Sequence, residues 1–315
     1  MNSESTMPSV TESAHERILR NITTLHRKYT VSEPNFFKAR HYKTVLNNLK
    51  TVRVETREDI ARVAPGAGIR KTIEQIYTTG EDHPDVKEFE ATSDMHTSME
   101  TLSKVHGIGP SKARELVQKH GVRSIEDLRD PTRLDLLNEV QKKGLTYFED
   151  IQKRIPRKEM LKHDEFLRKG NHVTVMGSFR RGAKNSGDID VLLGGEENNL
   201  REFISDLVRK GYVQEGQEFA FGEVKYMGVC KLPRHKTWRR LDVLYAPPEE
   251  HPFAMLYFTG SKDLNTKMRA HALSKGLTLN EKGLFENDAR VPYVFRTERD
   301  IFDYLELPFV PPEER

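Results

Sequence analysis

Apolar residues in the first half of the chain recur with the three- to four-residue spacing of short amphipathic helices. The pattern covers residues 14–80 and residues 97–150, and neither region carries a convincing strand signal. Between them, the acidic and polar stretch Gly80–Asp85 is typical of a linker. Residues 1–13 are rich in Ser and Thr and predict a mobile tail. The first half is therefore expected to be helical.

The second half mixes strands with helices. Apolar runs rich in β-branched residues predict strands at 172–176, 224–229 and 241–244, and a helical pattern at 199–210 separates the first two. This order predicts a β-α-β unit. A further helix is expected around 264–275, followed by short strands and a Pro-rich end. The chain should therefore contain a helical part followed by an α/β part.

Two acidic residues, separated by a single residue, stand at the start of an apolar strand pattern. Asp188 and Asp190 project from the same face of such a strand, because strand side chains alternate with a period of two. Carboxylates held that close repel each other unless cations neutralise them, and Mg²⁺ is typically held by one or two carboxylates together with substrate phosphates. Asp242 supplies a third acid on another apolar strand. An Asp-x-Asp pair alone is common by chance, so the interpretation depends on its surroundings.

A turn rich in glycine and arginine precedes the acidic pair. The segment Gly177–Gly182 contains Gly-Ser followed by Arg180 and Arg181, which are suited to a polyphosphate. The sequence shows no Ser-His or Cys arrangement for nucleophilic catalysis. Carboxylates together with phosphate donors therefore indicate nucleotidyl transfer assisted by two Mg²⁺ ions, with Mn²⁺ as a substitute.

Composition and charge add little to the predicted class of protein. The 315 residues are enough for about two to four small domains. Lys and Arg number 51 against 48 Asp and Glu, and the resulting net charge of +3 does not by itself indicate nucleic-acid binding. A single cysteine excludes an internal disulfide and fits a reducing compartment. No apolar run approaches the ~20 residues of a membrane span. We expect an intracellular protein, nuclear if eukaryotic, with a viral or microbial source left open.

In these motifs the sequence resembles the X family of DNA polymerases. The resemblance rests on the acidic motifs and on further segments that follow the family's order and lie near its spacing. It is dense from about residue 100 to residue 285 and looser at both ends. The further segments are Val105–Ser111, Tyr147–Phe148, Arg154–Arg157, Met227–Cys230, Tyr257–Ser261 and Met268–His271.

The resemblance implies a multi-domain α + α/β fold. Helical N-terminal domains with helix-hairpin-helix motifs should precede a mixed-sheet nucleotidyltransferase palm and a small α+β C-terminal subdomain. The implied domains are a lyase-like domain at 14–90, a DNA-binding subdomain at 91–153, the catalytic palm at 154–260 and a nucleotide-binding subdomain at 261–315. The implied function is gap-filling DNA synthesis in repair of the base-excision type. A monomer is expected to act on gapped or nicked duplex DNA and deoxynucleoside triphosphates, away from membranes.

The resemblance also assigns roles at the polymerase centre. The three acids would hold both metals, with Asp242 as a candidate proton acceptor, and Arg240 would hold the primer phosphate. Lys262 departs from the family, in which an acid stands beside the incoming base, and we expect this cation to strengthen nucleotide binding. The residues implied to bind the nucleotide are Arg154, Ser178, Arg181, Ser186, Gly187, Tyr257, Phe258, Gly260, Lys262, Asn265 and Arg269.

Two glycine-containing turns predict contacts with DNA phosphates. Val105–Ser111 precedes a helix with apolar i, i+3 spacing, and its glycines let two helices approach closely and present backbone N–H groups, as in a helix-hairpin-helix. Ala64–Ile69 is a weaker hairpin of the same kind. The predicted DNA-binding residues are Gly66, Gly68, Gly107, Ile108, Gly109, Ser111 and Lys112. The family resemblance adds a Na⁺ or K⁺ ion on the backbone carbonyls of Ser103, Val105 and Ile108.

A second activity is left open by the resemblance. In the family, the N-terminal domain binds a downstream 5′-phosphate, and a lysine forms a Schiff base with deoxyribose phosphate. Lys38 and Tyr42 match part of that pocket. The nucleophile's position falls on Glu74, or on Thr72 if a two-residue gap is allowed, and Lys71 is the nearest amine. 5′-Deoxyribose-phosphate lyase activity is therefore doubtful.

Three alternatives differ in testable features. A template-independent or end-joining nucleotidyltransferase acting on DNA ends tends to have a longer loop than Lys231–Trp238 before Asp242. A nucleotidyltransferase acting on RNA ends or on a small molecule would share the acids but not the glycine hairpin or Tyr-Phe-Thr-Gly. A catalytically idle DNA-binding scaffold is disfavoured because all three acids are intact.

Overall fold

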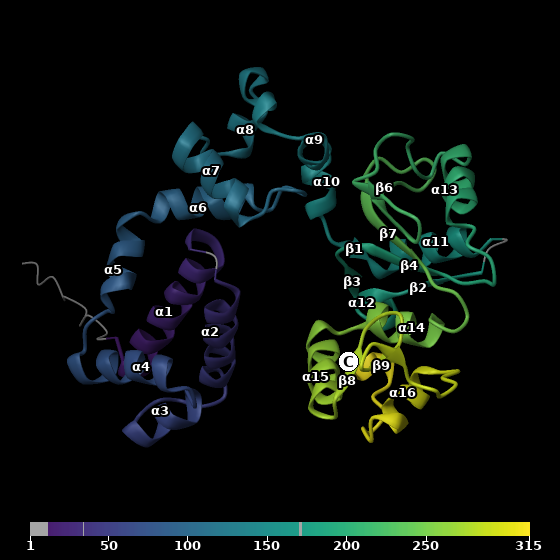
Figure 1. Ribbon diagram of the computed structural model, residues 1–315. Helices are drawn as coiled ribbons and strands as arrows, with labels where there is room; N and C mark the ends of the chain where they lie inside the picture. The colour runs from purple at the N-terminus through teal and green to yellow at the C-terminus, as the bar shows by residue number, and fades with distance from the viewer. Residues whose placement is uncertain (1–11, 34, 170–171) are drawn as a thin grey trace, which may run out of the picture. The chain divides into compact units, whose positions relative to one another are not determined.

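The computed structural model describes residues 12–33, 35–169 and 172–315. It divides into two compact units, Met1–Leu145 and Thr146–Arg315. Most of the predicted tail, residues 1–13, lies outside the described residues. The described part of the first unit is helical, and the second unit combines helices with sheets (Figure 1). The α + α/β class is therefore confirmed at this level.

The helices of the first unit begin where the sequence supplies caps. Ser13 and Thr56 each accept a backbone hydrogen bond three residues on and complete a capping box with Glu16 and Asp59. Apolar side chains of the first four helices form one core. The elements are α1 (Ala14–Arg27), a π-helix (Lys28–Ser32), α2 (Phe36–Leu49), α3 (Arg57–Val63), α4 (Ala67–Thr79), α5 (Pro84–Ala91), α6 (Ser93–Leu102), α7 (Pro110–His120), α8 (Ile125–Leu128), a 3₁₀ helix (Pro131–Leu136) and α9 (Glu139–Thr146).

The predicted linker at Gly80–Asp85 is a packed turn. Asp82 accepts hydrogen bonds from Arg20 Nη2 and Asn21 Nδ2, both at 2.7 Å, and these contacts hold the turn on α1. Helix α5 already begins at Pro84, since proline suits the first position of a helix. The acidic residues of this stretch predicted a linker, but one of them, Asp82, forms an ion pair with Arg20.

The second unit is built on a five-stranded sheet of order β2-β4-β7-β6-β5. β4 and β7 are parallel, and the remaining neighbours are antiparallel. Odd-numbered residues of β4 and β7 lie in the main core, while Leu192 packs in a smaller cluster with Ala254 of α14. The elements are α10 (Phe148–Gln152), β1 (Ile155–Pro156), α11 (Arg157–Arg168), β2 (Val173–Val175), α12 (Gly177–Arg180), β3 (Asn185–Ser186), β4 (Ile189–Leu193), α13 (Leu200–Arg209), β5 (Ala220–Phe221), β6 (Lys225–Cys230), β7 (Arg239–Tyr245) and α14 (His251–Thr259).

The predicted β-α-β unit is only partly correct. The strands and the intervening helix α13 are present. However, β2 and β6 are separated in the sheet by β4 and β7, so they are not neighbours. The parallel neighbours are β4 and β7, which lie about fifty residues apart in the chain. Local patterns predict strands well, but the order of strands depends on pairings between distant segments.

The C-terminal part forms a small α+β layer around its own core. A three-stranded antiparallel sheet of order β10-β9-β8 packs with the last helices. Its elements are α15 (Lys262–Ser274), β8 (Leu277–Leu279), β9 (Leu284–Glu286), β10 (Ala289–Arg290), α16 (Glu298–Tyr304) and a 3₁₀ turn (Pro312–Glu314). Among the described residues, no helix has both the length and the apolar character needed to cross a bilayer.

Candidate active site

Three acidic side chains meet on one face of the five-stranded sheet, at the interior strands β4 and β7. Asp190 on β4 and Asp242 on β7 face each other directly in the parallel register, and Asp188 immediately precedes β4. Carboxylate oxygens of all three lie within 4.8 Å of one another. The structure therefore brings together the acids that the sequence singled out.

Gly177 leaves room for the carboxylate of Asp190. Its φ of +58° lies in the left-handed region, and an added Cβ would fall 2.0 Å from Asp190 Oδ2. The backbone N–H of the preceding Met176 donates to the carbonyl of Asp190 at 2.8 Å, which fixes the turn to β4. Glycine is required at position 177 both by its backbone conformation and by the close approach.

Burial and mutual repulsion act on the acid cluster. Burial, together with the negative charge of Asp242, raises the pKa of Asp190 to about 7. Arg240 contacts Asp188, and its Nε lies 3.8 Å from Asp242 Oδ1. Hard oxygen donors crowded at one point are the donor set of a divalent cation such as Mg²⁺. The cluster could therefore hold metal.

A pocket of about 720 Å³ opens beside the acids. Every residue implied to bind the nucleotide lines it except Ser186. Ser186 is buried, and its hydroxyl accepts a hydrogen bond at 2.9 Å from that of Ser178, which lines the pocket. The lining residues are Arg154, Gly177, Ser178, Arg181, Gly187, Asp188, Asp190, Tyr257, Phe258, Thr259, Gly260, Lys262, Asn265, Thr266 and Arg269.

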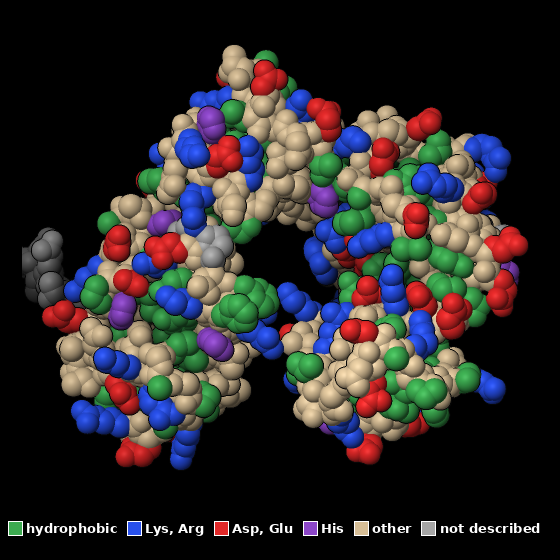
Figure 2. Space-filling model, viewed as in Figure 1, with side chains coloured by type: hydrophobic (Ala, Val, Ile, Leu, Met, Phe, Trp, Pro, Cys, Tyr) green, Lys and Arg blue, Asp and Glu red, His purple; other side chains and the backbone are tan. Residues whose placement is uncertain are grey.

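Two arginines of this pocket, Arg154 and Arg181, are held by hydrogen bonds to neutral oxygen atoms. Arg154 donates to the side-chain and backbone oxygens of Asn185 at 2.8 and 3.1 Å. Arg181 donates to the carbonyl of Thr259 at 2.6 Å. Neither arginine forms an ion pair with a carboxylate among the described contacts, so both guanidinium groups are available to an anionic ligand. Figure 2 shows Lys and Arg side chains gathered where β1, β3 and α12 lie.

The segment Tyr257–Gly260 forms the C-terminal turn of α14 and the residue that ends it. Asn265 Nδ2 donates to the carbonyl of Tyr257 at 2.8 Å, which satisfies a carbonyl that the helix leaves open. Arg269 lies over the Tyr257 ring at 5.5 Å and 3.5 Å from Glu281. Only the family resemblance predicted that Asn265 and Arg269 bind the nucleotide. The structure adds that both side chains contact Tyr257.

The glycine turn of the first unit joins α6 and α7. Gly107 has a φ of +86°, and its carbonyl accepts a hydrogen bond from Gln141 Nε2 at 3.0 Å. Gly144 on α9 was missed by sequence reasoning. A Cβ there would fall 2.2 Å from the carbonyl oxygen of His106, so glycine lets α9 pack onto the turn. A lone glycine inside a helical pattern was its only signal.

The remaining residues implied to contact DNA or a monovalent ion lie in two turns or in the first turn of the helix that follows each of them. Gly109 caps α7 and Gly66 caps α4, and a Cβ at either of them, or at Gly68, would meet open space. Ser111 is exposed, and Lys112 pairs with Glu115 at 3.0 Å. Along the first turn, the N–H of Ile108 donates to the carbonyl of Val105 at 3.0 Å, and Ser103 ends α6.

The pocket implied for lyase chemistry contains a stacked tyrosine pair, Tyr29 and Tyr42, with Lys38 close to it. Tyr42 is buried and stacks on Tyr29 at 5.5 Å, and Lys38 Nζ lies 4.5 Å above the Tyr29 ring. The Thr72 hydroxyl interacts with Tyr42, whose pKa is nevertheless raised to about 12 by burial. Lys71 is exposed. The structure thus places Thr72 next to Tyr42.

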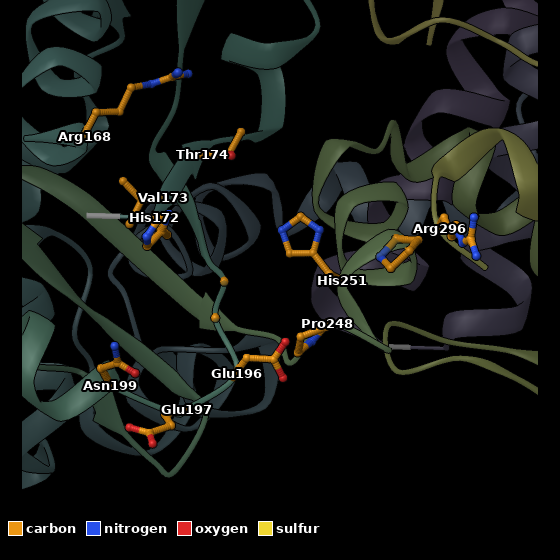
Figure 3. A pocket seen from close by; sticks show the side chains of 13 residues that line it. Arg168, His172, Val173, Thr174, Glu196, Glu197, Asn199, Pro248, His251 and Arg296 are labelled. Carbon is orange, nitrogen blue, oxygen red and sulfur yellow. The ribbon is translucent and has the colours of Figure 1, made fainter. Parts of the chain in front are cut away.

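A larger pocket of about 1000 Å³ lies at the opposite end of β4 from the acids (Figure 3). Arg168, Glu196 and Glu197 bring charges of both signs to its wall, and burial lowers the pKa of His251, which lies beside Gly194. Among the described residues, the acid triad forms the only group of three or more metal-ligating side chains. The acids and arginines, rather than the volume, make the smaller pocket the candidate site.

Comparison with protein families assigns most of the chain. The DNA polymerase beta palm matches residues 154–248, the DNA polymerase beta thumb matches residues 254–315, and the fingers domain of DNA polymerase lambda matches residues 100–152. These matches define the class: a protein with a palm and a thumb domain of the DNA polymerase beta type and a fingers domain of the DNA polymerase lambda type.

Relatives extend the similarity along the chain. In an alignment of 295 positions that covers 84% of this chain and 54% of the relative, the sequence is 31% identical to DNA polymerase lambda of Arabidopsis thaliana. In an alignment of 329 positions, gaps included, that covers 95% of this chain and 56% of the relative, it is 30% identical to DNA polymerase lambda of Rattus norvegicus. In an alignment of 296 positions that covers 79% of this chain and 58% of the relative, it is 26% identical to DNA nucleotidylexotransferase of Xenopus laevis.

The chain belongs to the X family of DNA polymerases, which confirms the resemblance found in the sequence motifs. It spans about half the length of the relatives that it matches.

Proposed function

We propose that this chain is a DNA-directed DNA polymerase that fills short gaps during repair. The observation that carries the proposal is the convergence of three carboxylates with the arginine-lined pocket. Membership of the X family supports DNA and deoxynucleoside triphosphates as the substrates.

Each part of the site has a defined task in this proposal. When bound by Asp188, Asp190 and Asp242, two Mg²⁺ ions supply Lewis-acid activation of a primer 3′-hydroxyl and stabilise the pyrophosphate leaving group. Arg154 and Arg181 orient the triphosphate through charge-assisted hydrogen bonds. Asp242 is the proposed proton acceptor, and Arg240, already beside Asp188, holds the primer phosphate.

DNA contacts are proposed for the first unit. The turn between α6 and α7 presents backbone N–H groups as a helix-hairpin-helix, and the turn before α4 acts similarly. Such contacts bind phosphates without reading sequence. The carbonyls of Ser103, Val105 and Ile108 are proposed to hold Na⁺ or K⁺. The proposed division remains a lyase-like domain, a hairpin subdomain, a palm and a nucleotide-binding subdomain, with the boundaries given by the sequence.

Primer extension on a one-nucleotide gap with Mg²⁺ tests the polymerase. We expect incorporation directed by the template base, and Asp190→Ala should abolish it while DNA affinity stays within a factor of about two. Normal turnover in Asp190→Ala would refute the assignment of the acids. An RNA 3′ end offered in parallel tests the alternative of a non-DNA nucleotidyltransferase.

Template-independent addition to DNA ends is the second candidate, and the similarity to a DNA nucleotidylexotransferase motivates it. The short loop between β6 and β7, residues 231–238, favours templated synthesis. Addition to a single-stranded primer as fast as to a gapped duplex would reverse this preference.

Lyase activity is not expected from the pocket around Tyr42. Thr72 offers a hydroxyl where Schiff-base chemistry needs an amine. Borohydride trapping on an incised abasic duplex should give no covalent adduct. An adduct that disappears in Lys71→Ala would restore the lyase and identify its nucleophile.

A further inference from the structure

A buried ion pair lies behind the acid cluster, on the other face of β7. The side chain of Arg239 is 7% exposed and that of Glu159 on α11 is 17% exposed. Arg239 Nε donates to Glu159 Oε1 at 2.8 Å, and Nη2 donates to Oε2 at 2.9 Å. This two-point geometry fixes the plane of the guanidinium group as well as its position.

The third contact of Arg239 reaches the segment that carries a nucleotide-pocket arginine. Arg239 Nη1 donates to the carbonyl oxygen of Lys153 at 3.0 Å. The next residue, Arg154, lines the pocket beside the acids. One buried guanidinium therefore ties together helix α11, the start of β7 and the backbone next to Arg154.

Strand alternation connects this pair to the metal-binding side. Because successive strand residues point to opposite faces, Arg239 lies on the core face of β7, whereas Arg240 and Asp242 lie on the face of the acids. Arg240 contacts Asp188, and Asp242 faces Asp190 across the parallel pair. A shift or rotation of the first residues of β7 would move both side chains relative to their partners on and before β4.

The surroundings of Glu159 keep the pair in one arrangement. One turn further along α11, His163 is 1% exposed, and its Nε2 lies 3.7 Å from Glu159 Oε1. Nδ1 of His163 is 2.6 Å from the hydroxyl of the fully buried Tyr212. Removing one charge from such a pair leaves the other buried without a partner.

We infer that Glu159 is a positioning residue for the proposed polymerase reaction. By holding the guanidinium of Arg239, it sets Asp242 and Arg240 for metal and primer and sets Arg154 for the triphosphate. Glu159 itself touches none of the reacting groups. The inference rests on the proposed function, but part of its test does not depend on polymerase activity.

The test compares Glu159→Gln with Asp164→Asn in the full chain. Asp164 lies on the same helix and pairs at 2.7 Å with Arg168, whose side chain is 55% exposed, so the control removes a surface ion pair. For Glu159→Gln we expect the Mg²⁺ concentration at half-maximal gap filling, and KM for the nucleotide, each to rise about tenfold. Affinity for gapped DNA should change less than twofold. Asp164→Asn should match the unaltered chain in all three.

Two further measurements separate positioning from loss of folding. Mn²⁺ binding, followed by electron paramagnetic resonance without DNA, should weaken about tenfold in Glu159→Gln, even if the chain lacked polymerase activity. Thermal unfolding identifies an assay temperature at which each variant is folded. Arg239→Lys keeps the charge but loses the planar two-point contact, so it should weaken Mn²⁺ binding in the same way.

The outcomes are distinct. If folded Glu159→Gln and Arg239→Lys bind Mn²⁺ and nucleotide as the unaltered chain does, the inference is wrong. If the unaltered chain binds Mn²⁺ but extends no primer, the proposed function fails, and the Mn²⁺ measurement still decides whether Glu159 positions the acids. If Glu159→Gln does not fold, Arg239→Lys decides.

Discussion

Replacing Gly177 with alanine perturbs the acid cluster at its tightest point. The new Cβ would lie 2.0 Å from Asp190 Oδ2. A carbon–oxygen contact is normally no shorter than about 3.3 Å, so the carboxylate or the turn must move by roughly 1.3 Å. The displaced oxygen belongs to a carboxylate that is expected to hold metal, so the consequence should be larger for catalysis than for folding.

Two terms set the size of the effect. Alanine at a φ of +58° carries a left-handed backbone cost of about 1–2 kcal/mol. Overpacking against Asp190 adds about 1–3 kcal/mol, so the free energy of unfolding should fall by about 2–5 kcal/mol. A misplacement of about 1 Å at the reacting groups should lower the rate of gap filling by on the order of 100-fold.

Gly211→Ala is the matched control. Its φ is +68°, and an added Cβ meets nothing within 4 Å, so only the backbone cost of about 1–2 kcal/mol applies. Denaturant unfolding and single-turnover extension would be measured for both variants. The reasoning is refuted if Gly177→Ala extends primers as fast as Gly211→Ala, whether or not both are slower than the unaltered chain.

Three further predictions concern charge and surface. Because burial and Asp242 raise the pKa of Asp190 to about 7, protons compete with metal below that pH; the Kd for Mn²⁺ should rise about tenfold from pH 8 to pH 6 by calorimetry, and an unchanged Kd would contradict this. Phe36 and Phe37 are 71% and 74% exposed, so replacing both with Ala should weaken binding of single-stranded DNA by about 1–3 kcal/mol in fluorescence anisotropy if they stack on bases. Lys262→Asp should raise the KM for the nucleotide about tenfold, since it replaces a pocket cation with an anion, and unaltered kinetics would count against the role of Lys262.

Local sequence signals predicted which acidic residues lie together. Alternation placed Asp188 and Asp190 together, and an apolar strand around Asp242 supplied the third acid. Apolar spacing likewise predicted that the first unit is helical. These features depend on neighbours a few residues apart, which a sequence records directly.

Contacts between segments that are far apart in the chain could not be predicted from local sequence patterns. Nothing local indicates that Arg239 pairs with Glu159, eighty residues earlier, or that Gly144 meets the carbonyl of His106. The burial of Ser186 behind Ser178 was missed for the same reason. The order of strands follows from pairings that local periodicity does not encode.

The register between β4 and β7 constrains where the chain can change length. Asp190 and Asp242 face each other, so inserting or deleting one residue within either strand would exchange its two faces. Such a change in β7 would send Asp242 into the core and present apolar Leu241 to the cluster. Length variation in this sheet should therefore accumulate in the loops, such as residues 231–238, while the two strands keep a fixed number of residues over evolutionary time.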